Sequence, residues 1–222
     1  MNKELIEILK IYSTGTHGQL SSYLVGKSKD TLSGVLVDLI TMYINDKNSS
    51  TLREFLTCTL AGYNHKEKKI GYNGFKQDTF SGKTINCEAK PKNVDTNSGK
   101  TEKLNGHGNF SDYTFARLER DLHEDRLNML VSGFIDGRLI YILEFPFSCP
   151  SFVEKLRAQL MHKLPGGKDL PNEYVRSAVF SYRHFADCKD LEVVFIASKE
   201  ELQKNQQYIA RDFYKFLEGK AK

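Results

Sequence analysis

The stretch QDTFSGKTINCEAK, residues 77–90, carries the clearest structural signal in this chain. Apolar side chains alternate there with polar ones: Ile85, Cys87 and Ala89 against Asn86, Glu88 and Lys90. A period of two predicts a β-strand with one face toward a core and the other toward solvent. Glu88 and Lys90 then project together from the outer face. Pro91 lacks a backbone N–H and is predicted to close the strand.

Asp78 precedes Glu88 in the same stretch, and the turn between them decides whether the two carboxylates meet. Cross-strand partners share a face, so they converge only if the turn is odd in length and centred on Lys83. Gly82 permits the left-handed conformation that three- and five-residue loops need. We therefore predict an odd loop with Asp78 opposite Glu88. Two carboxylates and the Lys90 ammonium at one point can hold a divalent cation beside a phosphate, as phosphodiester hydrolysis requires.

Asp78, Glu88 and Lys90 resemble the Asp…(Asp/Glu)-x-Lys signature of the PD-(D/E)XK nuclease superfamily, to which most type II restriction endonucleases belong. The signature covers a short part of the 222 residues, and Gln77 stands where the family name has proline. The resemblance implies a restriction endonuclease-like core, which is a mixed β-sheet flanked by helices on both sides. It also implies Mg²⁺-dependent cleavage of double-stranded DNA, often by a homodimer.

By this resemblance, the metal ligands would be the carboxylates of Asp78 and Glu88 and the main-chain carbonyl of Ala89. Lys90 would hold the attacking water, help to deprotonate it and offset charge in the transition state. Many nucleases of this kind carry an auxiliary acid on the helix before the sheet. Glu54 matches that position, although a solvated helical glutamate is the plainer interpretation.

The function that we expect is a type II site-specific deoxyribonuclease. Three alternatives stay open. The chain could be a DNA repair or junction-resolving nuclease, or a nucleic-acid-binding protein without catalysis. It could also be an unrelated α/β scaffold in which the motif is coincidental, since a Glu-x-Lys pair is common on the solvated face of a strand.

Candidate DNA-binding residues lie in three places. Lys92 and Asn93 directly follow the signature, where the scissile phosphate must pass. The other candidates are Arg117, Arg120, Arg183 and His184. Arginine can read guanine edges or neutralise phosphate, but surface charges paired with local acids are the plainer interpretation for most of these residues.

Composition describes a globular domain with an uneven charge distribution. The chain has 222 residues, 40% hydrophobic and 27% charged, and a net charge of +4. Residues 61–103 contain nine lysines and five acidic residues, so this segment holds the whole excess. Basic residues around a carboxylate pair favour a polyanionic substrate, although a solvated lysine-rich hairpin has the same composition.

Other motifs argue against nucleotide, zinc and membrane chemistry. Gly82-Lys83-Thr84 and Gly99-Lys100-Thr101 lack the first glycine of a phosphate-binding loop, so no nucleotide cofactor is expected. The four cysteines are far apart, which is typical of reduced thiols. His107, between two glycines, could act as a base, but loop histidines are commonly inert. No apolar run reaches membrane-spanning length, and we expect a cytoplasmic protein.

The pattern predicts a single nuclease domain, with a helical portion of about residues 1–62 packed on an α/β core of about residues 63–222. Helices are predicted at 2–12, 31–44, 51–61, 111–126, 152–163 and 199–217. Strands are predicted at 68–72 and 75–80 around Asn73-Gly74, at 85–90, at 128–135 and 138–145 around Asp136-Gly137, and at 175–185 and 191–197. The order predicts an α/β sandwich with a mixed sheet.

Overall fold

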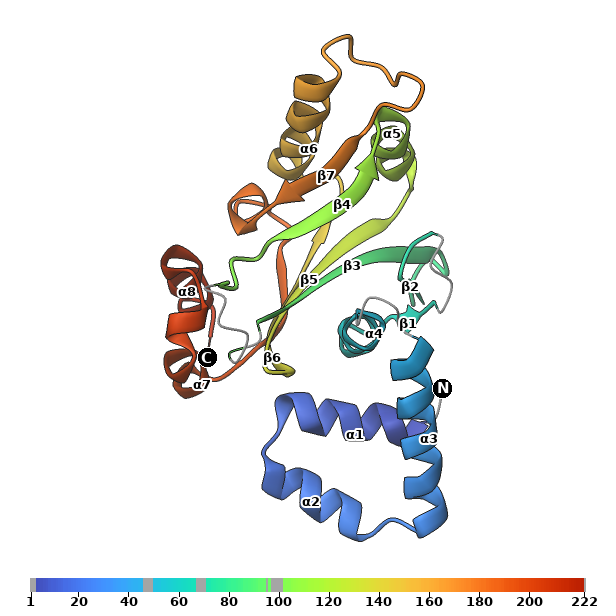
Figure 1. The fold of residues 1–222 in the computed structure, drawn as a ribbon, viewed down its shortest axis with the longest axis vertical. Coiled ribbons are helices and arrows are strands. Elements are labelled where there is room, and N and C mark those ends of the chain that lie inside the picture. The colour runs from blue at the N-terminus through green and yellow to red at the C-terminus, as the bar shows by residue number, and fades with distance from the viewer. Residues whose placement is uncertain (1–2, 46–49, 67–70, 95, 97–101, 222) are drawn as a thin grey trace.

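A computed structural model describes residues 3–45, 50–66, 71–94, 96 and 102–221. In that part of the chain a six-stranded sheet has the order β1-β2-β3-β5-β6-β8, and β4 pairs with β7 in a separate two-stranded sheet. The β3–β5 pair is parallel, whereas the other pairs are antiparallel. Helices lie on both faces of the larger sheet (Figure 1), so the predicted α/β class with a mixed sheet is confirmed.

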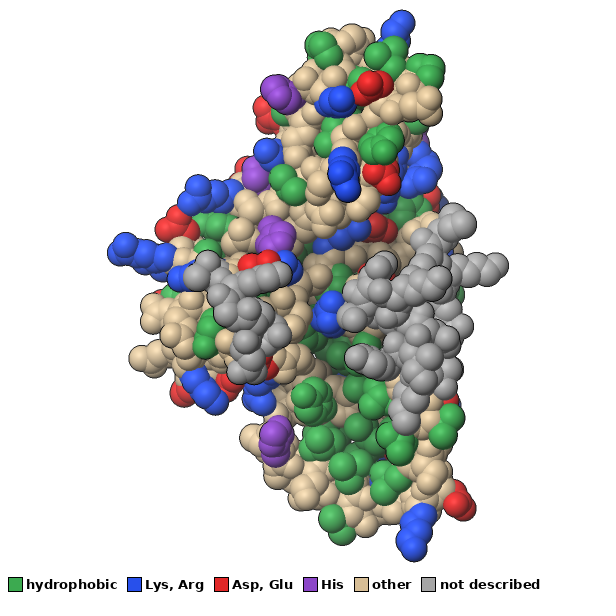
Figure 2. All heavy atoms as spheres, in the orientation of Figure 1, with side chains coloured by type: hydrophobic (Ala, Val, Ile, Leu, Met, Phe, Trp, Pro, Cys, Tyr) green, Lys and Arg blue, Asp and Glu red, His purple; other side chains and the backbone are tan. Residues whose placement is uncertain are grey.

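Four N-terminal helices lie on one side of the sheet: α1 (Lys3–Thr14), α2 (His17–Val25), α3 (Lys29–Asn45) and α4 (Thr51–Leu60). Leu5 and Phe55 of this group pack with Phe134 and Ile142 of the sheet. Sequence patterning missed α2, whose start is stabilised by a capping box between Thr16 and Gln19. Figure 2 shows apolar side chains gathered on the surface where α1 to α3 lie.

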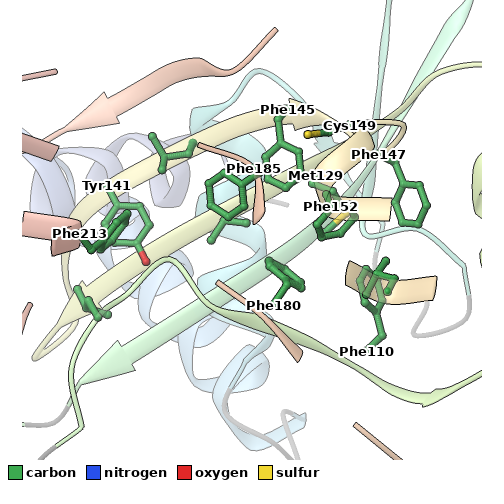
Figure 3. Close-up of a cluster of buried hydrophobic side chains, with 14 of the residues drawn as sticks. Phe110, Met129, Tyr141, Phe145, Phe147, Cys149, Phe152, Phe180, Phe185 and Phe213 are labelled. Atoms are coloured by element: carbon green, nitrogen blue, oxygen red, sulfur yellow. The ribbon is translucent and has the colours of Figure 1, made fainter. Parts of the chain in front are cut away.

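The opposite face is covered by β4 (Gly108–Tyr113), α5 (Phe115–His123), α6 (Pro150–Lys163), β7 (Val175–Phe180), α7 (Lys199–Lys204) and α8 (Arg211–Glu218). Aromatic rings fill the space between these elements and the sheet (Figure 3). Phe152 has no exposed surface, and its ring centroid lies 4.9 Å from that of Phe180 and 5.2 Å from that of Phe145. This layer fixes the position of β4 over β3.

The β5–β6 hairpin follows the prediction closely. Strand β5 spans Leu127–Ile135 and β6 spans Arg138–Pro146, with Asp136 and Gly137 between them. Both turn residues have positive φ, 48° and 77°, as a type I′ turn requires. Strand β8 (Glu192–Ile196) pairs with β6, near the predicted 191–197.

Several predicted boundaries are wrong. The helix predicted from residue 111 begins at Phe115, because Thr114 caps it and residues 108–113 form β4. The strand predicted over 175–185 ends at Phe180, and the predicted closing helix is divided into α7 and α8. Asn73-Gly74 is not a turn, since β1 (Asn64–His65) pairs with β2 (Gly74–Gln77) directly through His65 and Gly74. The predicted strand at 68–72 lies partly outside the described residues.

Strand β3 (Thr84–Val94) continues through Pro91 and does not stop there. The Asn86 N–H donates to Arg126 on the β5 side, and the Ala89 N–H donates to the Asn73 side chain on the β2 side. Alternation therefore points the N–H position of Pro91 toward the β2 side. Because pairing between β2 and β3 ends at Gly74 and Cys87, a proline costs no ladder hydrogen bond there.

A buried polar cluster joins the sheet edge to its centre on the α4 side. Glu144 Oε1 accepts hydrogen bonds from Tyr63 Oη at 2.5 Å, Asn128 Nδ2 at 2.6 Å and Lys76 Nζ at 3.2 Å. Burial is the first cause that raises the pKa of the Tyr63 phenol, and the charge of Glu144 raises it further. The cluster connects β2 with β5 and β6, since Lys76 lies on β2, and so helps to fix the β2–β3 hairpin.

Candidate functional site

A groove of about 490 Å³ lies at the open edge of β3, beyond the last β2 pair. Its lining includes residues from four elements and the chain before β4. Predicted site residues that meet there are Glu54, Ala89, Lys90, Lys92 and Arg117, and His107 and Asn109 lie beside them. Figure 2 shows the face on which charged side chains line a hollow above the N-terminal helices.

Glu88 and Lys90 form a close ion pair on the face of β3 that is covered by β4 and α5. Lys90 Nζ lies 2.7 Å from Glu88 Oε1 and 4.6 Å from the ring centroid of Phe110. Glu88 is 7% exposed, so its carboxylate is held where charge interactions are strong. Arg117 Nη2 approaches the same Oε1 at 3.6 Å. The predicted Glu-x-Lys pair is therefore a buried, cation-rich feature and not a solvated one.

Arg117 extends this network toward α5. Its guanidinium lies over the rings of Phe110 and Tyr113, and its Nε is 3.8 Å from Asp121 Oδ2. Arg120 binds the same carboxylate through Nε and Nη2, at 3.0 Å and 2.7 Å. Burial raises the pKa of Asp121, and the neighbouring Arg120 opposes that change. Arg117 lines the groove, whereas Arg120 is committed to Asp121.

Glu54 reaches the β3 edge through Asn73. Asn73 Nδ2 donates to Glu54 Oε2 at 3.1 Å, and Asn73 Oδ1 accepts from the Ala89 N–H at 2.8 Å. The register between β2 and β3 ends at the Gly74–Cys87 pair, and Asn73 lies directly beyond it. The helix α4 thus brings a carboxylate to the signature strand from the other face of the sheet.

Asp78 is not at this site, and the predicted odd loop is wrong. Gln77 pairs with Thr84, and the Asp78 N–H donates to the Lys83 carbonyl, which leaves an even, four-residue loop. Asp78 therefore lies beside Lys83 and not opposite Glu88. Glu88 follows Lys83 along the extended chain at a distance of about 17 Å, at roughly 3.3 Å per residue.

The local structure explains where the Asp78 carboxylate goes. Oδ1 accepts from the backbone N–H groups of Phe80 and Ser81, and Oδ2 pairs with Arg126. These two backbone N–H groups, with Arg126, lower the pKa of Asp78 to about 2. Gly82 has a φ of 66°, which is the predicted left-handed conformation. The aspartate is a turn-forming residue at the tip of the hairpin.

The remaining predicted DNA contacts are divided between the groove and other places. Lys92 lies in the groove and pairs with Glu102 at 2.8 Å. Asn93 Oδ1 accepts from the Gly137 N–H at 3.1 Å, which is a structural role beside the β5–β6 turn. Arg183 pairs with Asp212, and His184 accepts from the Ser181 N–H within a 3₁₀ turn. Neither Arg183 nor His184 lines the groove.

Among the groove residues that sequence patterning missed are Asn109 and Ser111, both on β4. They alternate with buried Phe110, which is the period of a strand, but Ser111-Asp112 resembles the start of a helix. His107 stands out in the sequence only as a loop histidine. The structure places it in the groove, directly before β4.

Comparison of the chain with protein-family models, with curated proteins and with solved structures found no match. Within the described residues, the helices are all too short or too polar to cross a membrane. The groove and its side chains are therefore the basis for any assignment of function.

Proposed function

We propose that this protein is a Mg²⁺-dependent endonuclease that hydrolyses phosphodiester bonds in double-stranded DNA at the β3 groove. The observation that carries the proposal is that Glu54, Ala89 and Lys90 line one groove at an open strand edge, with Glu88 bound to Lys90 beside it. Glu54 takes the place that the sequence motif gave to Asp78. Of the family signature, the Glu-x-Lys half supports the proposal and the aspartate does not.

The oxygen donors at this edge suit Mg²⁺. The Ala89 N–H points to the β2 side, and in a strand the carbonyl of the same residue points the same way. That carbonyl and the carboxylates of Glu54 and Glu88 are hard oxygen ligands. In the part of the chain that the structure describes, no three His, Cys, Asp or Glu side chains gather into a cation site. Two carboxylates, one carbonyl and several waters are the kind of set that Mg²⁺ accepts.

The protein's own cations supply the rest of the chemistry. A bound Mg²⁺ would withdraw charge from the scissile phosphate. Lys90 is held in place by Glu88 and by the Phe110 ring, so its ammonium is oriented before a substrate arrives. Lys90 would orient the attacking water, and Arg117 would bind a non-bridging phosphate oxygen. Lys92 would leave its ion pair with Glu102 and contact the neighbouring phosphate.

In its specific form, the proposal is restriction-type cleavage by a homodimer in which each subunit cuts one strand of a pseudo-symmetric site. The enzyme would act in the cytoplasm. A repair or junction-resolving nuclease would share the groove but would act on branched or damaged DNA.

One observation favours a second function, which is nucleic-acid binding without catalysis. Asp78 is bound to Arg126 away from the groove, and Glu88 already pairs with Lys90 and Arg117. The Lys90 and Arg117 side chains would bind phosphate in this groove even if no metal ion bound there.

The experiment is cleavage of supercoiled plasmid and phage DNA by purified protein with Mg²⁺, with and without a chelator, followed by mapping of the ends. Lys90→Met tests the groove, and Lys83→Met on the hairpin tip is the matched control. We expect ends at one short sequence with wild type and Lys83→Met, and none with Lys90→Met. Cutting of branched DNA alone would favour the repair enzyme. Binding without cutting in Mg²⁺ or Mn²⁺ would reject the nuclease.

A further inference from the structure

The segment Leu104–Gly108 is anchored against the C-terminal part of the chain. The Leu104 N–H donates to the Tyr208 carbonyl at 2.8 Å, and the Ala210 N–H donates to the Leu104 carbonyl at 2.8 Å. The Tyr182 N–H donates to the Asn105 carbonyl at 3.2 Å. A loop that is bound on both sides in this way presents its side chains from a fixed backbone.

The glycines on either side of His107 allow the close packing. Gly106 has a φ of 64°, and a Cβ there would lie 2.8 Å from Cβ of Tyr182. A Cβ on Gly108 would lie 2.6 Å from Cζ of Phe180 and 2.9 Å from Cβ of Lys90. Any larger residue at either position would push the segment outward. The backbone of this segment therefore runs directly beside Lys90, and His107 is the side chain that it brings to the groove.

Asn105 fixes the tautomer of the His107 ring. Asn105 Oδ1 lies 3.1 Å from the His107 backbone nitrogen, which can only donate, so this atom is the amide oxygen. The same Oδ1 lies 2.6 Å from Nδ1 of His107. Nδ1 must therefore carry the proton of the neutral ring. Nε2 is left with a free lone pair.

The surroundings favour the neutral ring. Burial lowers the pKa of His107 below its usual value, and the charge of Lys92 lowers it further, while Glu102 acts in the opposite direction. Charged groups also line the groove around the ring: Glu54, Lys90, Lys92 and Arg117. Three of these four are cations that disfavour an imidazolium. A histidine in this state can accept a proton at neutral pH.

We propose that His107 is a catalytic residue of the groove, which takes the proton of the attacking water on Nε2. The inference rests on the proposed nuclease function. Lys90, as an ammonium paired with Glu88, has no lone pair to receive that proton. The water oxygen forms its bond to phosphorus, the bond from phosphorus to the leaving oxygen breaks, and the water proton moves to Nε2. The leaving oxygen takes a proton from solvent, and His107 later returns its proton to solvent.

The first test compares His107→Gln with wild type in single-turnover cleavage between pH 5 and 9 with Mg²⁺. Loss of a positioned base lowers a rate by about 10² to 10⁴-fold. We expect a loss in that range, and we expect the acidic limb of the wild-type profile to disappear. DNA binding in Ca²⁺ and the thermal midpoint should stay near wild type. His162, an exposed residue of α6, provides the matched control: His162→Gln should cleave normally.

The second test uses Asn105→Asp, which keeps an acceptor on Nδ1 but adds a negative charge. That charge raises the pKa of His107, so the acidic limb of the cleavage profile should move to higher pH. This variant decides the matter if His107→Gln is unstable, because an unmoved limb would overturn the inference. Normal cleavage by His107→Gln would overturn the role of His107 but not the proposed nuclease function. A loss of DNA binding equal to the loss of cleavage would do the same. A wild type that never cuts would defeat both proposals.

Discussion

The most informative pair of substitutions is Glu54→Gln and Asp78→Asn, because they separate the site seen in the structure from the one predicted by the sequence motif. Both changes remove one negative charge and keep the side chain's shape. In Glu54→Gln the introduced amide oxygen can still accept the hydrogen bond from Asn73, so α4 and the β3 edge should remain in place. Asp78→Asn keeps an acceptor for the Phe80 and Ser81 N–H groups.

Distances decide the expected size of each effect. Asp78 lies about 17 Å along β3 from Glu88, estimated at roughly 3.3 Å per residue, and Mg²⁺ binds oxygens at about 2.1 Å. One cation cannot contact both carboxylates. Glu54 is separated from the Ala89 main chain by Asn73 alone, through bonds of 3.1 and 2.8 Å. Loss of an outer metal partner costs about 10- to 100-fold, so loss of a direct ligand should cost at least about 100-fold.

The assay is single-turnover plasmid cleavage at several Mg²⁺ concentrations, with DNA binding in Ca²⁺ as the control for folding. Glu54→Gln should cleave at least about 100-fold more slowly and should need more Mg²⁺. Asp78→Asn should cleave at a rate close to wild type. The opposite result, with Asp78 essential and Glu54 dispensable, would refute the placement of the site at the β3 edge.

Three further predictions concern stability. Phe152→Ala should lower the free energy of unfolding by about 3 to 5 kcal/mol in a urea titration, since its ring is fully buried among other rings; a loss under about 1 kcal/mol would contradict the packing in Figure 3. The pKa of Asp78 in the folded protein is lowered to about 2. Its contribution to the free energy of unfolding is therefore present above about pH 4 and is lost as pH falls toward 2. Asp78→Asn should flatten acid unfolding in that window, and an unchanged acid curve would reject the lowered pKa that the Phe80 and Ser81 N–H groups, with Arg126, give to Asp78. The raised pKa of Tyr63 keeps its phenol protonated in the folded protein, so the free energy of unfolding should fall as pH rises above about 10. Tyr63→Phe should reduce that fall, as measured by alkaline unfolding followed by tyrosine absorbance.

Local chemistry made the β5–β6 hairpin predictable. Two alternating apolar segments flank Asp136-Gly137, and both turn residues adopt the positive φ that this dipeptide tolerates. The same reasoning gave correctly which β3 side chains share a face, because Cys87 and Ala89 are buried with Cys58 of α4 while Lys90 lies over Phe110. The face that was predicted to meet solvent is instead covered by β4 and α5, and Glu88 is buried there. Where the period and the turn residues agree, the sequence was sufficient.

The turn before β3 shows why the register was not predictable. The left-handed conformation of Gly82 was expected, but it is compatible with loops of more than one length. The Asp78 carboxylate binds the N–H groups of Phe80 and Ser81, which is the competing turn chemistry of aspartate. That local preference set an even loop and removed Asp78 from the face of Glu88.

The groove itself depends on contacts between distant parts of the chain. Strand β4 pairs with β7, so Asn109 lies against Val179, and the segment that carries His107 is held by residues 182 and 208–210. No window of sequence around His107 contains these partners. The short polar-apolar alternation at 109–111 was the available signal, and the helix-like Ser111-Asp112 obscured it.

The most direct test of the account is anomalous X-ray scattering from Mn²⁺ in crystals of the protein with a short DNA duplex. We expect a Mn²⁺ peak at the β3 edge that contacts Glu54, Glu88 and the Ala89 carbonyl, with a phosphate beside Lys90. A peak at Asp78 on the hairpin tip, or DNA bound away from this groove, would contradict it.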